Sequence, residues 1–250
     1  MEQVNPIKRK INLEGNLNTR DIGGYPVSKN ERIRWGKLVR ADSMDQLTSN
    51  DQQQLLAYGV KCIIDIRDPF ELEKSPNVFS GDTDLHYVNI PILGDPQVSE
   101  ALGKASDLTA KYVVTLELCQ PQIRSILETF IKSADGCTII HCSAGKDRTG
   151  LLIALLLAAV GVSKDIILED YAISEIYLAP KIEHWLSGAK TEAAKQNILA
   201  NMTSSPEVLE GALTHLDQQY GGVLQYLERI GIAQQQIHSI SSKLVEHIPE

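Results

Sequence analysis

One ten-residue stretch limits the possible folds most strongly, because it separates two apolar runs of different length. Residues 141–150 read HCSAGKDRTG. A short β-branched run of strand length, 137–140, precedes them, and an unbroken apolar run of helix length, 151–160, follows them. The stretch is therefore predicted to be a loop between a buried strand and the N-terminus of a buried helix. Backbone N–H groups converge in such a loop and the helix dipole adds positive charge, so the loop should bind an anion.

Two side chains of this loop indicate which anion it binds. Cys142 stands near its start and Arg148 near its end, with five residues between them. A guanidinium group binds two phosphate oxygens in a bidentate manner. Amide dipoles and the Arg148 cation favour the thiolate form of Cys142, which is the nucleophilic form. The pair therefore predicts attack on phosphorus, a phosphocysteine intermediate, and stabilisation of the transition state by Arg148 and the loop amides.

Two other interpretations of the loop are weighed against this one. Cys142 could be only a small buried apolar residue. The Gly-Lys pair before a helix could also belong to a nucleotide-binding P-loop. That motif needs Ser or Thr after the lysine and glycine at its first position, whereas this sequence has Asp147 and Ile140 there. The spacing of Cys142 and Arg148 favours phosphate chemistry.

The stretch resembles the signature of the cysteine-dependent phosphatase superfamily, which is His-Cys, five residues, Arg, and then Ser or Thr. Its Gly-Lys-Asp-Arg-Thr-Gly version is similar to that of the bacterial tyrosine/serine protein phosphatase family. Three further segments resemble the same family, so the likeness covers nearly the whole chain: 18–25, 65–71 and 205–227. The resemblance implies a phosphomonoester hydrolase without a metal or other cofactor. Its substrates would be phosphotyrosine and phosphoserine/threonine proteins, and also phosphoinositides.

The resemblance assigns roles to the residues of the loop. Cys142 attacks the phosphate and Arg148 binds it. Thr149 would hydrogen-bond the leaving thiolate, while His141 points away from substrate in relatives and braces the loop. Lys146 adds a cation at the rim, and relatives with lysine here often accept phosphoinositides. The alternatives are a satisfied core histidine and a solvated surface lysine. The substrate-binding cradle would consist of Ser143, Ala144, Gly145, Lys146, Asp147 and Arg148.

Two aspartates are candidates for the general acid and base. The leaving group needs a proton and the intermediate then needs a base, and one carboxyl can serve both steps. Asp147 lies inside the loop, and relatives with this loop are thought to use it, although its neighbour Arg148 favours the ionised form. Asp95 matches the position of the superfamily's acid loop approximately, and an ordinary Asp-Pro turn is the alternative. We favour Asp147.

Charged residues outside the loop have structural and functional interpretations. Arg67 and Glu71 lie one helical turn apart, so an ion pair between them is favoured over a substrate contact. Arg20 and Asp21 stand in a glycine-containing turn. They either touch the substrate or form an internal ion pair that braces the turn.

The order of the apolar segments predicts an α/β fold with a mainly parallel central sheet flanked by helices, and a helical C-terminal part. The resemblance makes this fold cysteine-phosphatase-like. Strands are expected at 60–66 and 85–92, with the active loop at the carboxyl end of a central strand. Residues 97–110 are polar and small and are expected to form a mobile loop. The chain, 1–250, is expected to be a single phosphatase domain, in which 179–204 form a helical lid or a surface helix pair.

The composition excludes several classes of partner. The formal charge is −8, from 24 basic and 32 acidic residues, so no general attraction to nucleic acid or an anionic membrane is expected. The longest apolar run, 151–160, is shorter than the ~20 residues of a membrane span, and no secretory signal is visible. A cytoplasmic protein is expected, with leaderless export left open. The oligomeric state is also left open.

The four cysteines have neither metal-type spacing nor the pattern of a disulfide framework. Such usage fits a reducing compartment, which a thiolate nucleophile also needs. A thiolate at an open site should react with peroxide, and Cys62 or Cys137 could be its resolving partner. Two other function classes remain as alternatives, namely a catalytically dead phosphate-binding module and a rhodanese-type sulfurtransferase. The first would lack Cys142 or Arg148, and the second would not end its loop in Arg148-Thr149.

Overall fold

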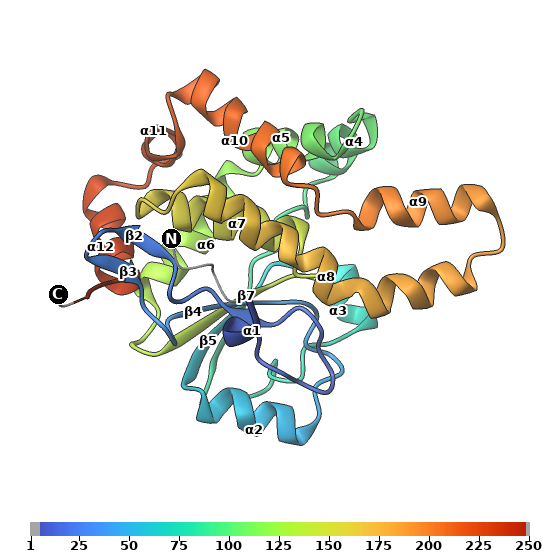
Figure 1. The fold of residues 1–250 in the computed structure, drawn as a ribbon, viewed down its shortest axis with the longest axis horizontal. Coiled ribbons are helices and arrows are strands. Elements are labelled where there is room, and N and C mark those ends of the chain that lie inside the picture. The colour runs from blue at the N-terminus through green and yellow to red at the C-terminus, as the bar shows by residue number, and fades with distance from the viewer. Residues whose placement is uncertain (1–5, 249–250) are drawn as a thin grey trace.

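A five-stranded sheet forms the centre of the protein, as a computed structural model that describes residues 6–248 shows (Figure 1). The strands are β1 (Arg20–Asp21), β2 (Pro26–Ser28), β3 (Glu31–Ile33), β4 (Leu38–Ala41), β5 (Val60–Asp65), β6 (His86–Asn89), β7 (Cys137–His141) and β8 (Val245–His247). The central sheet has the order β1-β4-β7-β5-β6, and every neighbouring pair is parallel except β1 with β4. The prediction of a mainly parallel sheet is confirmed.

Helices make up most of the remaining structure. They are α1 (Pro6–Arg9), α2 (Ser49–Ala57), α3 (Pro69–Lys74), α4 (Pro96–Lys104), α5 (Leu108–Leu118), α6 (Gln120–Lys132), α7 (Asp147–Ala159), α8 (Lys164–Gly188), α9 (Glu192–Met202), α10 (Pro206–Tyr220), α11 (Val223–Arg229) and α12 (Gln234–Leu244).

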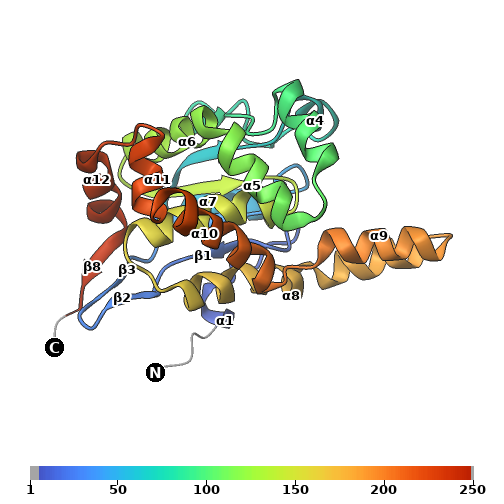
Figure 2. The same cartoon turned by 90° about the horizontal axis from the view of Figure 1, so that it is seen from above.

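Helices cover both faces of the central sheet. Helix α2 lies on one face, and α6, α7 and the C-terminal helices α10 to α12 lie on the other (Figures 1 and 2). Alternate side chains of the central strands reach the two layers. Ile64 and Ile140 join the larger core, whereas Ile63 and Ile139 join the core beneath α2. These strands are apolar on both faces because neither face meets water.

The segment between β6 and β7 is more helical than the sequence indicated. The expectation of a mobile loop at 97–110 is wrong, because α4 and the start of α5 occupy it. Asp95 accepts a hydrogen bond from the amide of Gln97 (2.8 Å), and Pro96 begins α4. Asp107 caps α5 in the same way. Such caps stabilise short helices at positions where composition alone indicates a loop.

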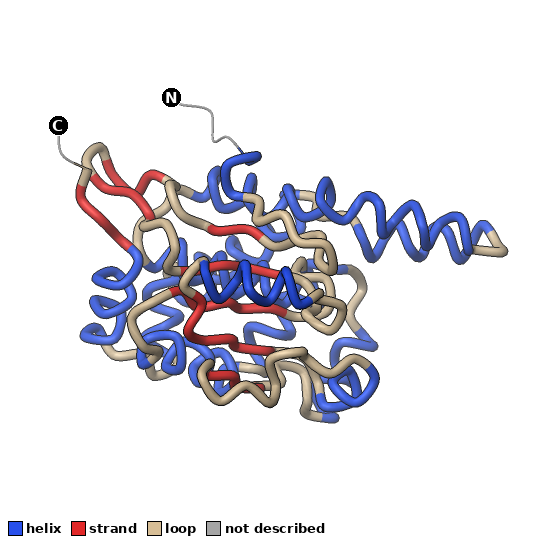
Figure 3. Tube along the Cα trace, turned by 90° about the horizontal axis from the view of Figure 1, so that it is seen from below, coloured by secondary structure: helices blue, strands red, loops and turns tan. Residues whose placement is uncertain are grey.

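A second, antiparallel sheet of order β2-β3-β8 joins the two ends of the described chain. Strand β8 pairs with β3 through Ile33 and Val245, at the end of the molecule opposite to α9 (Figure 3). Three residues are too few to show a strand periodicity, so the sequence did not reveal β8.

Helices α8 and α9 form an antiparallel pair that extends away from the body of the molecule (Figures 1 and 2). Residues 179–202 of the segment 179–204 belong to this pair and its connecting turn, and α8 continues through Pro180. Leu178, Ile182 and Met202 pack together at its base, against Ala144 of the active loop. The pair is thus anchored beside the loop. Among the residues that the structure describes, no helix has the length and apolar content to span a membrane.

Candidate active site

The loop between β7 and α7 has the predicted strand–loop–helix geometry. Strand β7 ends at His141 and α7 begins at Asp147, so the loop lies at the carboxyl end of the middle strand of the sheet. Gly145 has a φ angle of +64°, and a Cβ atom there would lie 2.4 Å from the carbonyl oxygen of Ala41. Glycine is therefore required at this turn, because β4 approaches the loop too closely for a side chain.

Cys142 lies at the base of the loop, and only 2% of the residue is exposed. Thr149, in the first turns of α7, is fully buried, and its hydroxyl has no hydrogen-bond partner within residues 6–248. A buried hydroxyl without a partner is costly, so such groups usually serve a ligand or a reaction. The hydroxyl of Thr149 therefore fits the predicted role of hydrogen-bonding the thiolate.

His141 points into the sheet and not into the cavity above the loop. Its Nδ1 lies 3.2 Å from the carbonyl oxygen of Cys142, and its Nε2 lies 2.9 Å from Nδ2 of Asn77 and 3.3 Å from Oδ2 of Asp65. Burial would raise the pKa of Asp65, but His141 and Arg67 hold it well below its usual range. These contacts place His141 where it can brace the loop from behind, as the resemblance implies.

Arg67 and Glu71 do not pair with each other, so the predicted ion pair between them is wrong. Arg67 turns back to Asp65, with 2.7 Å between Nη2 and Oδ2, and it also donates to Ser43 Oγ and the carbonyl of Ser75. The reason is that Arg67 precedes α3 and is buried under it. The one-turn spacing of a helix does not apply to this side chain.

Glu71 instead holds the active-site arginine. Its Oε2 and Oε1 accept hydrogen bonds of 2.6 Å and 2.8 Å from Nη1 and Nη2 of Arg148, and the hydroxyl of Ser143 also donates to it. Burial opposes the charge of Glu71, but Arg148 and Ser143 lower its pKa to about 2. The bidentate pair fixes the orientation of the Arg148 guanidinium. The sequence reasoning singled out Glu71 but could not identify this partner.

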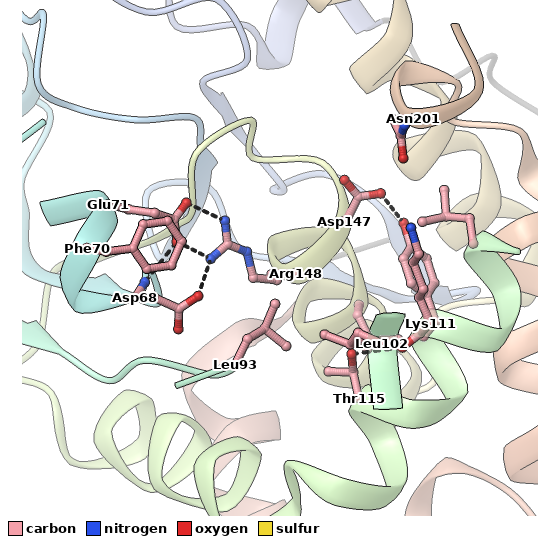
Figure 4. Close-up of a pocket in the computed structure, with 13 residues that line it drawn as sticks. Asp68, Phe70, Glu71, Leu93, Leu102, Lys111, Thr115, Asp147, Arg148 and Asn201 are labelled. Atoms are coloured by element: carbon pink, nitrogen blue, oxygen red, sulfur yellow. Dashed lines mark hydrogen bonds and ion pairs between the residues drawn. The ribbon is translucent and has the colours of Figure 1, made fainter. Parts of the chain in front are cut away.

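A cavity of about 360 Å³ opens next to Arg148 (Figure 4). One part of its wall is apolar and another is charged. The apolar side chains include Phe70, Leu93, Leu102, Leu108 and Leu151, and the charged side chains are Asp68, Glu71, Lys111, Asp147 and Arg148. A site of this kind suits a ligand with a phosphate at one end and an aromatic or aliphatic group at the other.

The two predicted proton-transfer candidates lie in different surroundings. Asp147 lines the cavity, accepts a hydrogen bond of 2.5 Å from the hydroxyl of Tyr112, and lies 3.0 Å from Nζ of Lys146. Asp95 caps α4 and is not among the described residues that line the cavity. The structure therefore brings Asp147 together with Arg148 and leaves Asp95 outside.

Lys146 is fully buried, so its expected position as a cation at the rim is wrong. Its Nζ donates to the carbonyl oxygens of Asn201 (2.9 Å) and Thr203 (2.7 Å), at the end of α9, and lies 3.0 Å from Oδ1 of Asp147. An ammonium group has three donors. Three acceptors of the protein surround it here, so Lys146 links the active loop to the α8–α9 pair.

A second charged cluster supports the loop from the side away from the cavity. Oδ1 of Asp170 lies 3.0 Å from Nε of Arg20, and its Oδ2 lies 2.5 Å from Nη1 of Arg40. Nη2 of Arg40 donates to the carbonyl of Gly145. Arg20 thus forms an internal ion pair, but with Asp170 and not with Asp21. No sequence signal distinguishes Asp170 from a surface residue of α8.

The other three cysteines are also buried. Cys62, Cys119 and Cys137 are free and buried, and burial raises the pKa of Cys62 and of Cys119 to about 11. Within the described part of the chain, no three His, Cys, Asp or Glu side chains are grouped as metal ligands would be.

Comparison with known proteins extends these observations to the whole chain. The sequence matches the tyrosine phosphatase family over residues 11–246. It is 32% identical over 236 residues to a tyrosine-protein phosphatase of Nostoc commune, covering 88% of this chain and 78% of that protein. It is 24% identical over 276 residues to the triple specificity protein phosphatase PtpB of Mycobacterium tuberculosis, covering 93% of this chain and 98% of that protein. The likeness therefore includes both sheets and the helical C-terminal part as well as the loop.

Proposed function

The chain belongs to the tyrosine phosphatase family, and from this premise we propose that it hydrolyses phosphomonoesters through a phosphocysteine intermediate on Cys142. One observation carries the proposal: a cysteine and an arginine share a strand–loop–helix turn, and Glu71 holds the arginine at the edge of a cavity. Phosphate would lie in the cradle of amides from Ser143 to Arg148, where the N-terminus of α7 adds positive charge.

The reaction proceeds in two displacements. The sulfur of Cys142 attacks phosphorus, the bond to the leaving oxygen breaks, and Arg148 stabilises the charge on the equatorial oxygens. Water then attacks the phosphocysteine, and the hydroxyl of Thr149 supports the departing thiolate. Of the two carboxyls that the sequence singled out, Asp147 is the one to which we assign a part in proton transfer, since it lines the cavity beside Arg148 and Asp95 does not.

Phosphotyrosine proteins are the proposed first substrates. The apolar wall of Phe70, Leu93 and Leu151 beside Arg148 suits an aromatic ring attached to the phosphate. Phosphoserine, phosphothreonine and phosphoinositides are proposed as further substrates, and the name of the triple specificity relative supports this breadth. We propose a single phosphatase domain of residues 1–250 that includes 179–204. We place it in the cytoplasm, because four free thiols suit a reducing compartment.

Replacement of the nucleophile tests the proposal. Cys142→Ser should abolish hydrolysis of phosphotyrosine peptide and nitrophenyl phosphate while phosphate still binds, because a serine hydroxyl stays protonated at neutral pH and the amides are unchanged. The wild-type rate should not respond to EDTA. Cys62→Ser is the matched control, since it makes the same change at a buried thiol outside the loop and should keep turnover. Residual hydrolysis by purified Cys142→Ser would contradict the mechanism.

A further inference from the structure

Asp68 is a cavity residue that the sequence analysis did not consider. It follows β5, precedes α3, and lines the cavity with Arg148 and Leu93 (Figure 4). Its Oδ2 lies 3.7 Å from Nη1 of Arg148, which is too far for a strong hydrogen bond. Its Oδ1 is buried and has no hydrogen-bond partner of good geometry among the described residues, although the backbone N–H of Leu93 faces the carboxyl. A carboxylate needs donors on both oxygens, so this environment suits the neutral acid better than the anion.

The other two carboxyls of the cavity have the opposite environment. Glu71 is held by both terminal nitrogens of Arg148, and Asp147 receives the hydroxyl of Tyr112 and faces the ammonium of Lys146. The donors on Glu71 stabilise its ionised form, so Glu71 is poorly prepared to give a proton to a leaving group. Asp147 is bonded through its Oδ1 to two groups of the protein, whereas Oδ1 of Asp68 is not.

The net charge of the cavity also favours a proton on Asp68. Its wall carries two cations, Arg148 and Lys111, and three carboxyls. With the Cys142 thiolate included, ionisation of all three carboxyls would leave the site with two negative charges in excess before a dianionic phosphate enters. A proton on Asp68 lowers this excess to one, so binding of the substrate itself favours the neutral acid.

We propose that Asp68 is the general acid of the first displacement and that Asp147 is the general base of the second. This refinement rests on the proposed phosphatase function. As sulfur bonds to phosphorus and the P–O bond breaks, the carboxyl proton of Asp68 passes to the leaving oxygen and frees an alcohol or phenol. Water then attacks phosphorus, one of its protons passes to Asp147, and the S–P bond breaks to release the Cys142 thiolate and inorganic phosphate. Exchange with solvent returns a proton to Asp68 and removes one from Asp147.

The groups that face Asp68 determine its proton affinity. Burial raises the pKa of Asp68, Arg148 of α7 and the backbone N–H of Leu93 oppose this effect, and Glu71 of α3 adds to it. Cys119, between α5 and α6, is a further titratable neighbour and is neutral at physiological pH because burial raises its pKa to about 11. The acid form of Asp68 is lost as pH rises through its pKa. Reaction of poor leaving groups should therefore decline on the alkaline side of the profile.

The experiment compares leaving groups in Asp68→Asn, Asp147→Asn and wild type. Phenyl phosphate and phosphotyrosine peptide need a proton on the leaving oxygen, whereas nitrophenolate departs readily without one. For Asp68→Asn, kcat/KM should fall about 100-fold or more with the first two substrates and only slightly with nitrophenyl phosphate. The alkaline decline for phenyl phosphate should disappear. Asp147→Asn should lower kcat with every leaving group and leave kcat/KM less affected, because the base acts after the first displacement.

Asp84→Asn is the matched control, since the same change at an exposed carboxyl outside the cavity should alter neither constant. Equal losses of Asp68→Asn on all leaving groups, or no loss on any, would overturn the proposal. The proposal would also be overturned if Asp147→Asn alone showed a dependence on the leaving group. The wild-type alkaline decline is measured without any variant and would overturn the proposal if it were identical for nitrophenyl and phenyl phosphate. Activity of Cys142→Ser, by contrast, would defeat the phosphocysteine mechanism, whatever Asp68 does.

Discussion

Two charged clusters meet the active loop from opposite sides, and they differ in burial. The rear cluster is Arg20, Arg40 and Asp170, with side chains that are at most 1% exposed. The cavity cluster is Asp68, Glu71 and Arg148, with side chains that are 10–16% exposed. In the rear cluster, both oxygens of the carboxylate are bonded, to Arg20, Arg40 and the hydroxyl of Tyr25. In the cavity cluster, one oxygen of Asp68 has no hydrogen bond from the described residues.

This difference distinguishes the rear cluster, which stabilises the loop, from the cavity cluster, which takes part in the reaction. A buried carboxylate with donors on both oxygens stabilises one geometry and offers little to a ligand. A cavity carboxyl with an unused oxygen keeps its chemistry available. Since Nε of Arg40 also lacks a partner among the described residues, the two clusters differ in the bonding of their carboxyl oxygens, and this is a better guide to function here than the presence of an arginine–carboxylate pair.

Asp170→Asn should show the largest effect on stability. It would leave Arg20 and Arg40 buried with reduced compensation, and breaking such a pair costs about 3–5 kcal/mol of unfolding free energy. Urea denaturation measures the loss. Asp68→Asn is the comparison variant and should change the unfolding free energy far less, because asparagine can also occupy the N-cap of α3 and no well-placed donor binds Oδ1 of Asp68. Similar losses in both variants would contradict the distinction between the clusters.

The pH dependence of stability sharpens the same contrast. Burial alone would raise the pKa of Asp170, but Arg20 and Arg40 hold it well below its usual range. The ion pairs of Asp170 therefore stabilise the fold at pH values above the ordinary pKa of a carboxyl group. This stabilisation is lost as the pH falls below that pKa. Asp170→Asn should remove this part of the acid sensitivity.

A smaller effect is expected from Lys146→Met, which keeps the length of the side chain but removes its donors. Loss of hydrogen bonds from a charged donor to the carbonyls of Asn201 and Thr203 should cost about 1.5–3 kcal/mol locally. Hydrogen exchange of amides in 192–202 should accelerate. Activity on phosphotyrosine peptide and on a phosphoinositide should fall by the same factor, since Lys146 is not at the rim. A selective loss of phosphoinositide hydrolysis would contradict this position.

The parts that the sequence predicted depend on local patterns. The run 137–160 contains a strand, a loop and a helix in continuous order, so its geometry and the placement of Cys142 and Arg148 could be inferred directly. The mainly parallel sheet followed in the same way from alternating apolar segments. These features need no knowledge of which distant residues meet.

The parts that the sequence missed depend on partners far apart in the chain. Glu71 has Arg67 four residues away, yet it binds Arg148, which the fold of α3 against the loop brings near. Lys146 looks like a surface residue until the end of α9 surrounds it. Asp68 looks like a helix cap, and only the cavity shows that one of its oxygens is unused. Long-range contact decided each of these roles.

Direct detection of the intermediate tests the central claim. Wild-type protein is mixed with phosphotyrosine peptide, quenched in acid during turnover, digested, and searched by mass spectrometry for phosphate on the peptide that contains Cys142. The account predicts phosphocysteine at Cys142, more of it in Asp147→Asn, in which the second displacement is slowed, and none in Cys142→Ser. Turnover by wild-type and Asp147→Asn protein with no phosphate on Cys142, or with phosphate on another residue, would contradict the account.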